Sequence, residues 1–155
     1  MSRGVVGICF LCLCFTSLFG KQTFEYQHQF ILKKDEIGSI FINRKEVTKK
    51  AKASDNPNNE YVLRLRWTLF ANNSLIVLIK YRGYPTQYVL QKKYPLESII
   101  VPLLPDSIDE MNGKVYAKIV FADFNQSTKK ATFDIYLEDT NERILVEFKP
   151  PKPIP

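Results

Sequence analysis

Cysteine is scarce in this chain of 155 residues, and its distribution matters more than its number. All three copies, Cys9, Cys12 and Cys14, lie within residues 1–20, so residues 21–155 contain none. A mature chain beginning at residue 21 would have no disulfide, no thiol nucleophile and no cysteine-based metal site. Its fold must therefore be stabilised by a hydrophobic core, which a chain of 135 residues is long enough to form.

Glycine is also rare beyond residue 20, where only Gly38, Gly83 and Gly113 occur. Loops that hold phosphate groups need clustered glycines, because backbone amides must approach the ligand closely. The three glycines are far apart in the sequence, which argues against nucleotide binding of those types. We expect no cofactor.

His28 is the single histidine of the chain. A serine–histidine–aspartate site would have to use it as the base, and a zinc site would need more histidine or cysteine ligands than the chain has. His28 falls among Phe24, Tyr26 and Phe30 on one side of an alternating segment. This position favours a core or rim histidine with one hydrogen-bond partner, and a catalytic or ligand-binding role is the alternative.

The first twenty residues have the layout of a secretory signal peptide. Arg3 provides a positive start, Val5–Phe19 is an uncharged run, and cleavage is expected after Gly20. As a helix this run would be about 23 Å long, short of the hydrocarbon core of about 30 Å. An uncleaved anchor stays the alternative because Leu18 is larger than the residue preferred there. We predict export, to a periplasm or to the extracellular space.

Most of residues 21–148 show period-two patterning, which is typical of β-strands. The alternation is cleanest over residues 61–70, where Leu63, Leu65, Trp67 and Leu69 share the face expected to be buried. A turn at residues 72–74 and an apolar run over residues 75–81 complete a predicted hairpin. Further strands are expected over residues 24–33, 39–43, 87–91, 98–103, 115–124, 131–138 and 143–148.

This pattern predicts an all-β, antiparallel β-sandwich of about eight short strands, with an up-and-down β-barrel as the alternative. The proline-bounded segments 87–91 and 98–103 should be edge strands or strand ends. The segments beginning at residue 115 should form one meander that includes residues 143–148. The capping signals of residues 106–113 predict a short helix there. Residues 21–148 would form one domain, followed by a proline-rich tail, 149–155, that cannot enter a sheet.

Basic and aromatic side chains alternate between residues 80 and 94, and 21 basic residues face 16 acidic ones beyond residue 20, a net charge of +5. Arginine, lysine and tyrosine together suit anionic or flat ligands. The pattern predicts a binding surface, and an ordinary solvated face is the alternative. The candidate residues are Lys80, Tyr81, Arg82, Tyr84, Tyr88, Lys92, Lys93 and Tyr94.

Two glycosylation sequons begin at Asn72 and Asn125, and both fall in predicted hairpin turns. The aspartate two residues before Asn125 resembles the extended acidic sequon of some bacterial oligosaccharyltransferases. Turn chemistry alone also explains asparagine and serine at these positions.

We therefore expect an exported, non-catalytic protein that binds another protein or an anionic glycan, and not nucleic acid or a metal. One alternative is a barrel that binds a small molecule. A second alternative is a hydrolase that uses two carboxylates about 5–9.5 Å apart. Its candidate acids are Asp106, Asp109, Glu110, Asp123, Asp134 and Glu138. Membrane contact would be limited to an uncleaved leader.

Overall fold

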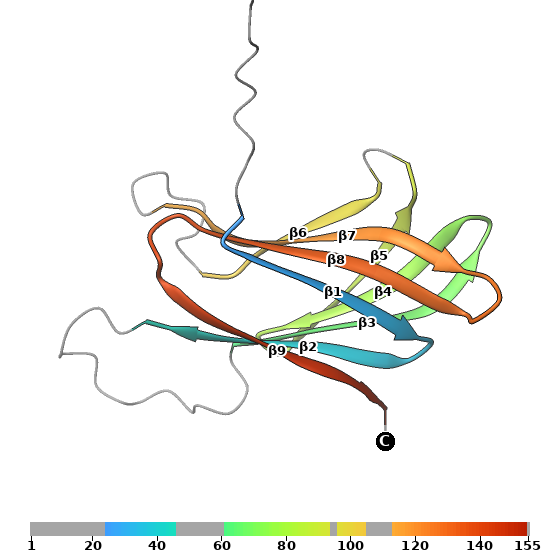
Figure 1. Ribbon diagram of the computed structural model, residues 1–155, viewed down its shortest axis with the longest axis horizontal. Helices are drawn as coiled ribbons and strands as arrows, with labels where there is room; N and C mark the ends of the chain where they lie inside the picture. The colour runs from blue at the N-terminus through green and yellow to red at the C-terminus, as the bar shows by residue number, and fades with distance from the viewer. Residues whose placement is uncertain (1–23, 46–60, 94–95, 105–112, 155) are drawn as a thin grey trace, which may run out of the picture.

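The computed structural model describes residues 24–45, 61–93, 96–104 and 113–154, and these residues form nine β-strands and no helix (Figure 1). None of the described residues belongs to a helix long and apolar enough to span a bilayer. The strands are β1 Tyr26–Lys33, β2 Glu36–Arg44, β3 Val62–Ala71, β4 Ser74–Tyr81, β5 Tyr84–Gln91, β6 Ser98–Pro102, β7 Val115–Asn125, β8 Lys130–Asp139 and β9 Ile144–Pro153.

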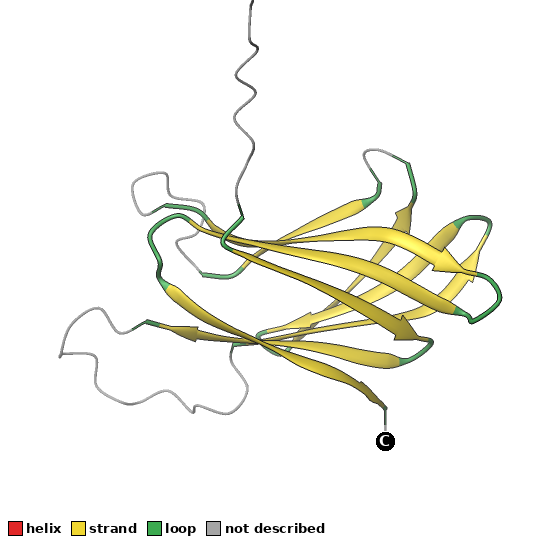
Figure 2. Ribbon diagram, viewed as in Figure 1, coloured by secondary structure: helices red, strands yellow, loops and turns green. Residues whose placement is uncertain are grey.

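The nine strands form two antiparallel sheets that face each other across the core (Figure 2). One sheet has the order β1-β8-β7-β6 and the other has the order β5-β4-β3-β2-β9. This architecture confirms the predicted β-sandwich. The alternative of a closed barrel is wrong, because the strands divide into two sheets that each end in unpaired edge strands. β5 and β6 are edge strands, as their prolines predicted.

The core lies between the sheets and is built from the alternate residues of each strand. Leu63, Leu65 and Trp67 of β3 are buried, in agreement with the alternation of the sequence. Trp67 also joins the two sheets, because its indole N–H donates a 2.9 Å hydrogen bond to the carbonyl oxygen of Leu32. The pairing of β3 with β4 confirms the predicted hairpin.

Two register shifts interrupt the alternation near the same end of the sandwich. One lies between Trp67 and Leu69, and the other lies between Phe121 and Asp123. Each shift is an irregularity of the β-bulge kind, which moves the following side chains to the opposite face. Leu69 is consequently 50% exposed, so its predicted burial is wrong, and Phe70 packs against the core instead.

The last strand differs from the sequence prediction in two ways. β9 does not continue the meander of β7 and β8, because it joins the other sheet and pairs with β2. The prediction that residues 149–155 cannot enter a sheet is also wrong, since β9 extends to Pro153. β9 is an edge strand, where a proline can be accommodated because one side of the strand has no ladder partner. The predicted helix over residues 106–113 lies almost entirely outside the described residues.

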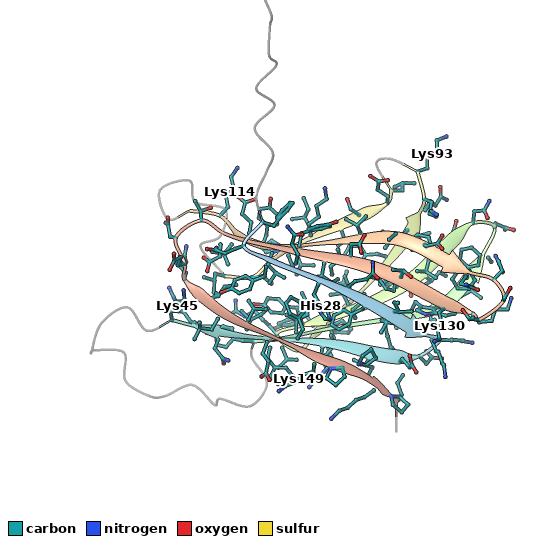
Figure 3. The ribbon with its side chains drawn as sticks, viewed as in Figure 1. His28, Lys45, Lys93, Lys114, Lys130 and Lys149 are labelled. Atoms are coloured by element: carbon teal, nitrogen blue, oxygen red, sulfur yellow. The ribbon has the colours of Figure 1, made fainter. Side chains whose placement is uncertain are left out.

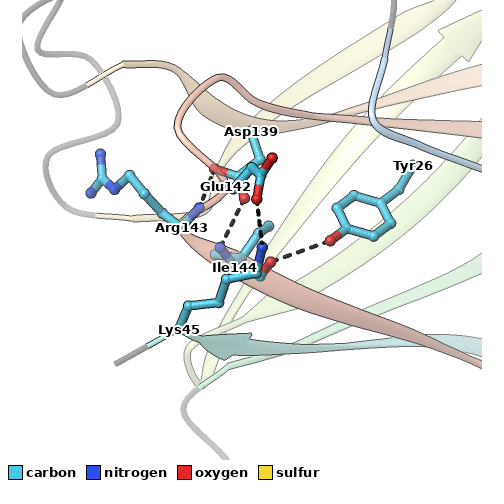
Figure 4. A network of polar contacts seen from close by, with 6 residues as sticks. All are labelled: Tyr26, Lys45, Asp139, Glu142, Arg143 and Ile144. Atoms are coloured by element: carbon cyan, nitrogen blue, oxygen red, sulfur yellow. Dashed lines mark hydrogen bonds and ion pairs between the residues drawn. The ribbon is translucent and has the colours of Figure 1, made fainter. Parts of the chain in front are cut away.

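A buried aspartate holds the connection between the two sheets at the end of β8 (Figure 4). The two carboxylate oxygens of Asp139 accept hydrogen bonds from the backbone N–H groups of Arg143 and Ile144, each at 2.8 Å. The Tyr26 hydroxyl donates to the Ile144 carbonyl at 3.3 Å, which ties β1 to the start of β9. These bonds fix the point at which the chain crosses from one sheet to the other.

Candidate binding surfaces

The structure separates the predicted surface at residues 80–94 into two ends of one sheet. The β4–β5 turn carries Arg82, and Tyr84 begins β5 beside it. Lys92 and Lys93 follow the far end of β5. An eight-residue strand is about 27 Å long. These residues therefore do not form one continuous surface.

Within that segment, the tyrosines differ in their surroundings. Tyr84 is 79% exposed, whereas Tyr81 and Tyr88 pack against the core and are half-buried. The Tyr81 hydroxyl donates a hydrogen bond to the carbonyl of Leu103. The guanidinium carbon of Arg82 lies 5.9 Å from the centre of the Tyr61 ring. Tyr94 lies outside the described residues.

A different basic surface, which we call the basic face, covers the outer side of the five-stranded sheet. Residues that are opposite one another in a sheet share a face. Arg64 on β3 is opposite Lys80 on β4, and both belong to a row that crosses all five strands. The row consists of Pro85, Lys80, Arg64, Ser39 and Lys149, and the adjacent positions add Arg66 and Lys152.

The cations of the basic face outnumber its acids. Arg66 pairs with Asp35 at 3.5 Å, and Lys149 pairs with Glu147 on its own strand. Arg64 and Lys80 are direct cross-strand neighbours. Neither has a carboxylate partner among the described residues. Like charges that are directly opposite destabilise a sheet. The basic face therefore contains an unfavourable arrangement that an anionic ligand would relieve.

An apolar groove lies among these cations. Its volume is about 140 Å³, and Ile37, Leu78 and Pro85 line it between the side chains of Arg64 and Lys80. The face also presents an aromatic ring at its β9 side, where the Lys149 ammonium lies 5.5 Å from the centre of the Phe41 ring. Figure 3 shows Lys149 on the β9 side of the molecule.

The outer side of the four-stranded sheet has a different charge pattern. Lys118 on β7 is opposite Tyr136 and Ile100, so it has no like charge beside it in the ladder. Asp134 and Glu138 lie on the same outer face of β8. This face consequently has both signs of charge, and it offers a control for any property assigned to the basic face.

The carboxylates considered for hydrolysis are dispersed among the described residues. Asp134 accepts a 2.8 Å hydrogen bond from the side chain of Gln29, and Glu138 accepts one from the Tyr116 hydroxyl. Asp134 and Glu138 are four positions apart on one strand, a spacing of about 13 Å. Asp123 lies on β7 near another pocket. The loop acids Asp106, Asp109 and Glu110 lie outside the described residues.

His28 lies at the rim of the sandwich, where its contacts are with aromatic rings. Its ring stacks on Phe148 of β9, with 4.4 Å between the ring centres, and it meets the edge of Phe30 at 4.7 Å. This contact partly buries the imidazole and lowers its pKa from 6.5. Within the part of the chain that the structure describes, the His28 ring makes these ring contacts and not the expected hydrogen bond. No group of three potential metal ligands occurs within the described ranges.

A larger pocket opens at the end of the sandwich that carries the β3–β4 and β7–β8 turns. We call it the end pocket. Its volume is about 560 Å³, and it contains two of the predicted surface residues, Lys92 and Lys93. The remaining lining residues are Phe70, Asn72, Asn73, Gln91, Phe121, Asp123, Phe124 and Gln126.

Both sequons lie in exposed turns at this end. Asn72 has a φ of 50° in the β3–β4 turn and lines the end pocket. The side-chain oxygen of Asn125 accepts hydrogen bonds from the backbone N–H groups of Ser127 and Thr128, at 3.0 and 2.9 Å. These bonds show the turn role expected for Asn125, and glycosylation at either site stays a prediction.

Sequence reasoning missed most residues of both surfaces. Arg64 and Arg66 were visible as the polar positions of a clean strand, but their neighbours depend on pairing between strands. Phe70 and Phe124 reach the end pocket only because of the two register shifts. Comparison of the chain with protein-family models, with curated proteins and with solved structures found no match.

Proposed function

We propose that this chain is an exported, non-catalytic binding protein that recognises an acidic segment of another protein through its basic face. Export is supported by the leader at residues 1–20. Binding is supported chiefly by one observation, the direct opposition of Arg64 and Lys80 with no carboxylate partner among the described residues. A carboxylate placed between these two cations would relieve their repulsion and gain two ion pairs.

The apolar groove favours a protein segment over a glycan. Ile37, Leu78 and Pro85 offer a hydrophobic depression of about 140 Å³, which suits one aliphatic side chain. Carboxylates on either side of that side chain would reach Arg64 and Lys80. An anionic glycan would satisfy the cations but would leave the groove in contact with polar groups. An extended peptide has side chains on the same face about 6.6 Å apart, which matches the spacing of Lys80 and Leu78, two positions apart on the same face of β4.

The position of the charges also predicts how salt should affect the affinity for an acidic segment. The guanidinium and ammonium groups of the basic face are at the surface, so bulk salt screens them. Complementary charge of this kind contributes to the rate of association and to the choice of partner. We therefore expect the affinity for an acidic segment to fall as ionic strength rises.

Fluorescence anisotropy tests the proposal with a labelled peptide in which glutamate and leucine occupy alternate same-face positions and serine fills the positions between them, so that both residue types face the same side of the extended chain. The variant R64Q/K80Q removes the two cations without adding charge. We expect it to weaken peptide binding about tenfold, or about 1.4 kcal/mol. The matched variant K114Q/K118Q removes the same charge from β7 of the four-stranded sheet and from the residue that precedes it, and it should change the affinity less than about twofold.

Two further probes determine which part of the proposal holds. A peptide with glutamine in place of glutamate should bind weakly, because it retains the leucines and lacks the charges. Heparin tests the competing ligand class. Equal losses in the two double variants would contradict the assignment to the basic face. Tight binding of heparin, together with no binding of the acidic peptide, would replace the protein segment with an anionic glycan.

A further inference from the structure

We propose a second binding site, the end pocket, and we assign it to a saccharide unit. The site is distinct from the basic face, because it opens between the two sheets and not on the outer side of one. Its volume of about 560 Å³ lies within the range of pockets that hold small organic ligands. Its walls combine aromatic rings with amide and charged groups, which is the combination that a sugar ring requires.

The aromatic wall comes from both sheets. Phe70 of β3 stacks on Phe124 of β7, with 3.9 Å between ring centres and 14° between ring planes. Trp67 supports this pair from the core, since it meets Phe124 edge-on at 5.5 Å. The register shifts in β3 and β7 place these rings at the opening of the sandwich. The wall is therefore fixed by packing before any ligand arrives.

The polar rim offers hydrogen-bonding groups that the protein does not use. The side-chain amides of Asn72 and Asn73 make no hydrogen bond to any described residue. Gln91 donates from its amide nitrogen to Ser74 at 3.0 Å, and this bond leaves the side-chain oxygen of Gln91 as an acceptor. Amides supply both donors and acceptors, which matches the dual character of sugar hydroxyls.

A charged pair spans the rim. The Lys92 ammonium lies 2.8 Å from a carboxylate oxygen of Asp123, and both groups are more than half exposed. The hydrogen bond from Lys92, together with one from the backbone of Phe124, lowers the pKa of Asp123. Asp123 is therefore an ionised acceptor at neutral pH. Lys93 adds a cation with no carboxylate partner in the described part of the chain, and Figure 3 shows it extending away from the strands.

These features favour a saccharide over other small ligands. A purely apolar ligand would desolvate the rim amides without pairing them, and it would desolvate the Lys92–Asp123 ion pair. A small inorganic anion would not use the aromatic wall. A sugar ring has apolar C–H faces and polar edges, so it satisfies both walls of the end pocket together. The cation of Lys93 further favours a sugar with a carboxylate over a neutral sugar.

Ligand-observed NMR with the protein tests this assignment. The probes are glucuronic acid, N-acetylneuraminic acid, N-acetylglucosamine and mannose, each as the free sugar. We expect saturation transfer to at least one of them, with the strongest transfer to the ring C–H protons that face the aromatic wall. Absence of transfer to all four sugars at millimolar concentration would overturn the proposal.

Two variants locate the bound sugar. F70L removes one ring of the wall, and N73G removes one rim amide while keeping a residue that accepts the φ of 57° at this turn. We expect each variant to weaken sugar binding at least about fivefold. F148L, which removes a ring stacked on His28, should leave sugar binding within about twofold.

Two comparisons decide between this site and the basic face. Equal losses in F70L and F148L would overturn the end pocket as the site, because Phe148 does not line it. Binding of the sugars should persist in R64Q/K80Q, since neither residue lines the end pocket. Loss of sugar binding in that double variant would likewise overturn the assignment. Failure of the peptide assay above would leave the sugar result unaffected.

Discussion

Replacement of Asp139 should lower the free energy of unfolding more than replacement of any surface acid. Asp139 is 2% exposed, and its carboxylate accepts two backbone N–H groups at the crossing between the sheets. D139A would leave both donors without partners. An unsatisfied buried donor costs about 1–3 kcal/mol in stability. The cost for the N–H of Arg143 should be at the lower end of this range, because that hydrogen bond is only partly buried. We expect a total loss of about 2–4 kcal/mol.

D139N separates the hydrogen bonds from the volume of the side chain. Asparagine keeps one acceptor oxygen but directs an NH₂ group toward the second backbone donor. We expect a loss of about 1–2 kcal/mol, between wild type and D139A. D134N is the matched control, because Asp134 lies on the outer face and accepts a hydrogen bond from the exposed Gln29. Its effect should stay within about 0.5 kcal/mol.

Urea denaturation followed by tryptophan fluorescence provides the measurement, since Trp67 is buried in the core. The midpoint should fall in the order wild type, D139N, D139A, with an unchanged dependence on urea. A total stability of about 5–15 kcal/mol makes losses of this size readily measurable. If D139A had the stability of D134N, the account of the crossing between the sheets would be refuted.

Two other predictions concern β9 and its neighbours. NMR titration should give His28 a pKa below 6.5, and F148A should raise it, because removal of the stacked ring re-exposes the imidazole. The folded protein then binds this proton less tightly than the unfolded chain, so stability should be full above pH 6.5 and should decrease as the pH falls below it. Deletion of residues 149–155 should cost about 1–2 kcal/mol, through lost ladder bonds to β2 and the lost contact of Lys149 with Phe41. Unchanged stability after this deletion would show that these residues do not pair in solution.

Local patterns in the sequence were sufficient to predict the hairpin of β3 and β4. The alternation over residues 63–67 gives the buried positions directly, and the asparagines at 72 and 73 adopt positive φ values of 50° and 57°. These φ values are those of the tight turns that suit the twist of two paired strands. Local composition and local geometry agree here, so the prediction is confirmed.

The register shifts could not be predicted from the alternation. A single irregular position in β3 exchanges the faces of Leu69 and Phe70, and a similar one in β7 positions Phe124. In the sequence, Leu69 continues the alternation set by Leu65 and Trp67, so no local feature of the sequence marks the register shift. The aromatic wall of the end pocket was missed for this reason.

Pairing between distant strands determines the basic face and could not be predicted either. Lys149 reaches this face because β9 leaves the meander and pairs with β2, more than one hundred residues earlier in the chain. The prolines of residues 149–155 suggested a free tail, because proline lacks a ladder donor. An edge strand tolerates the missing N–H donor of proline, because one side of the strand has no ladder partner. β9 therefore pairs with β2 despite its prolines.

Chemical-shift mapping with the acidic peptide tests the central claim most directly. The peptide of the anisotropy assay, with serine between its glutamates and leucines, is titrated into the labelled protein, and amide shifts are followed for every strand. The account predicts that the largest changes occur in β3 and β4 around Arg64 and Lys80, with smaller changes in β2 and β9. Changes concentrated on β1, β7 and β8, or spread evenly over both sheets, would contradict it.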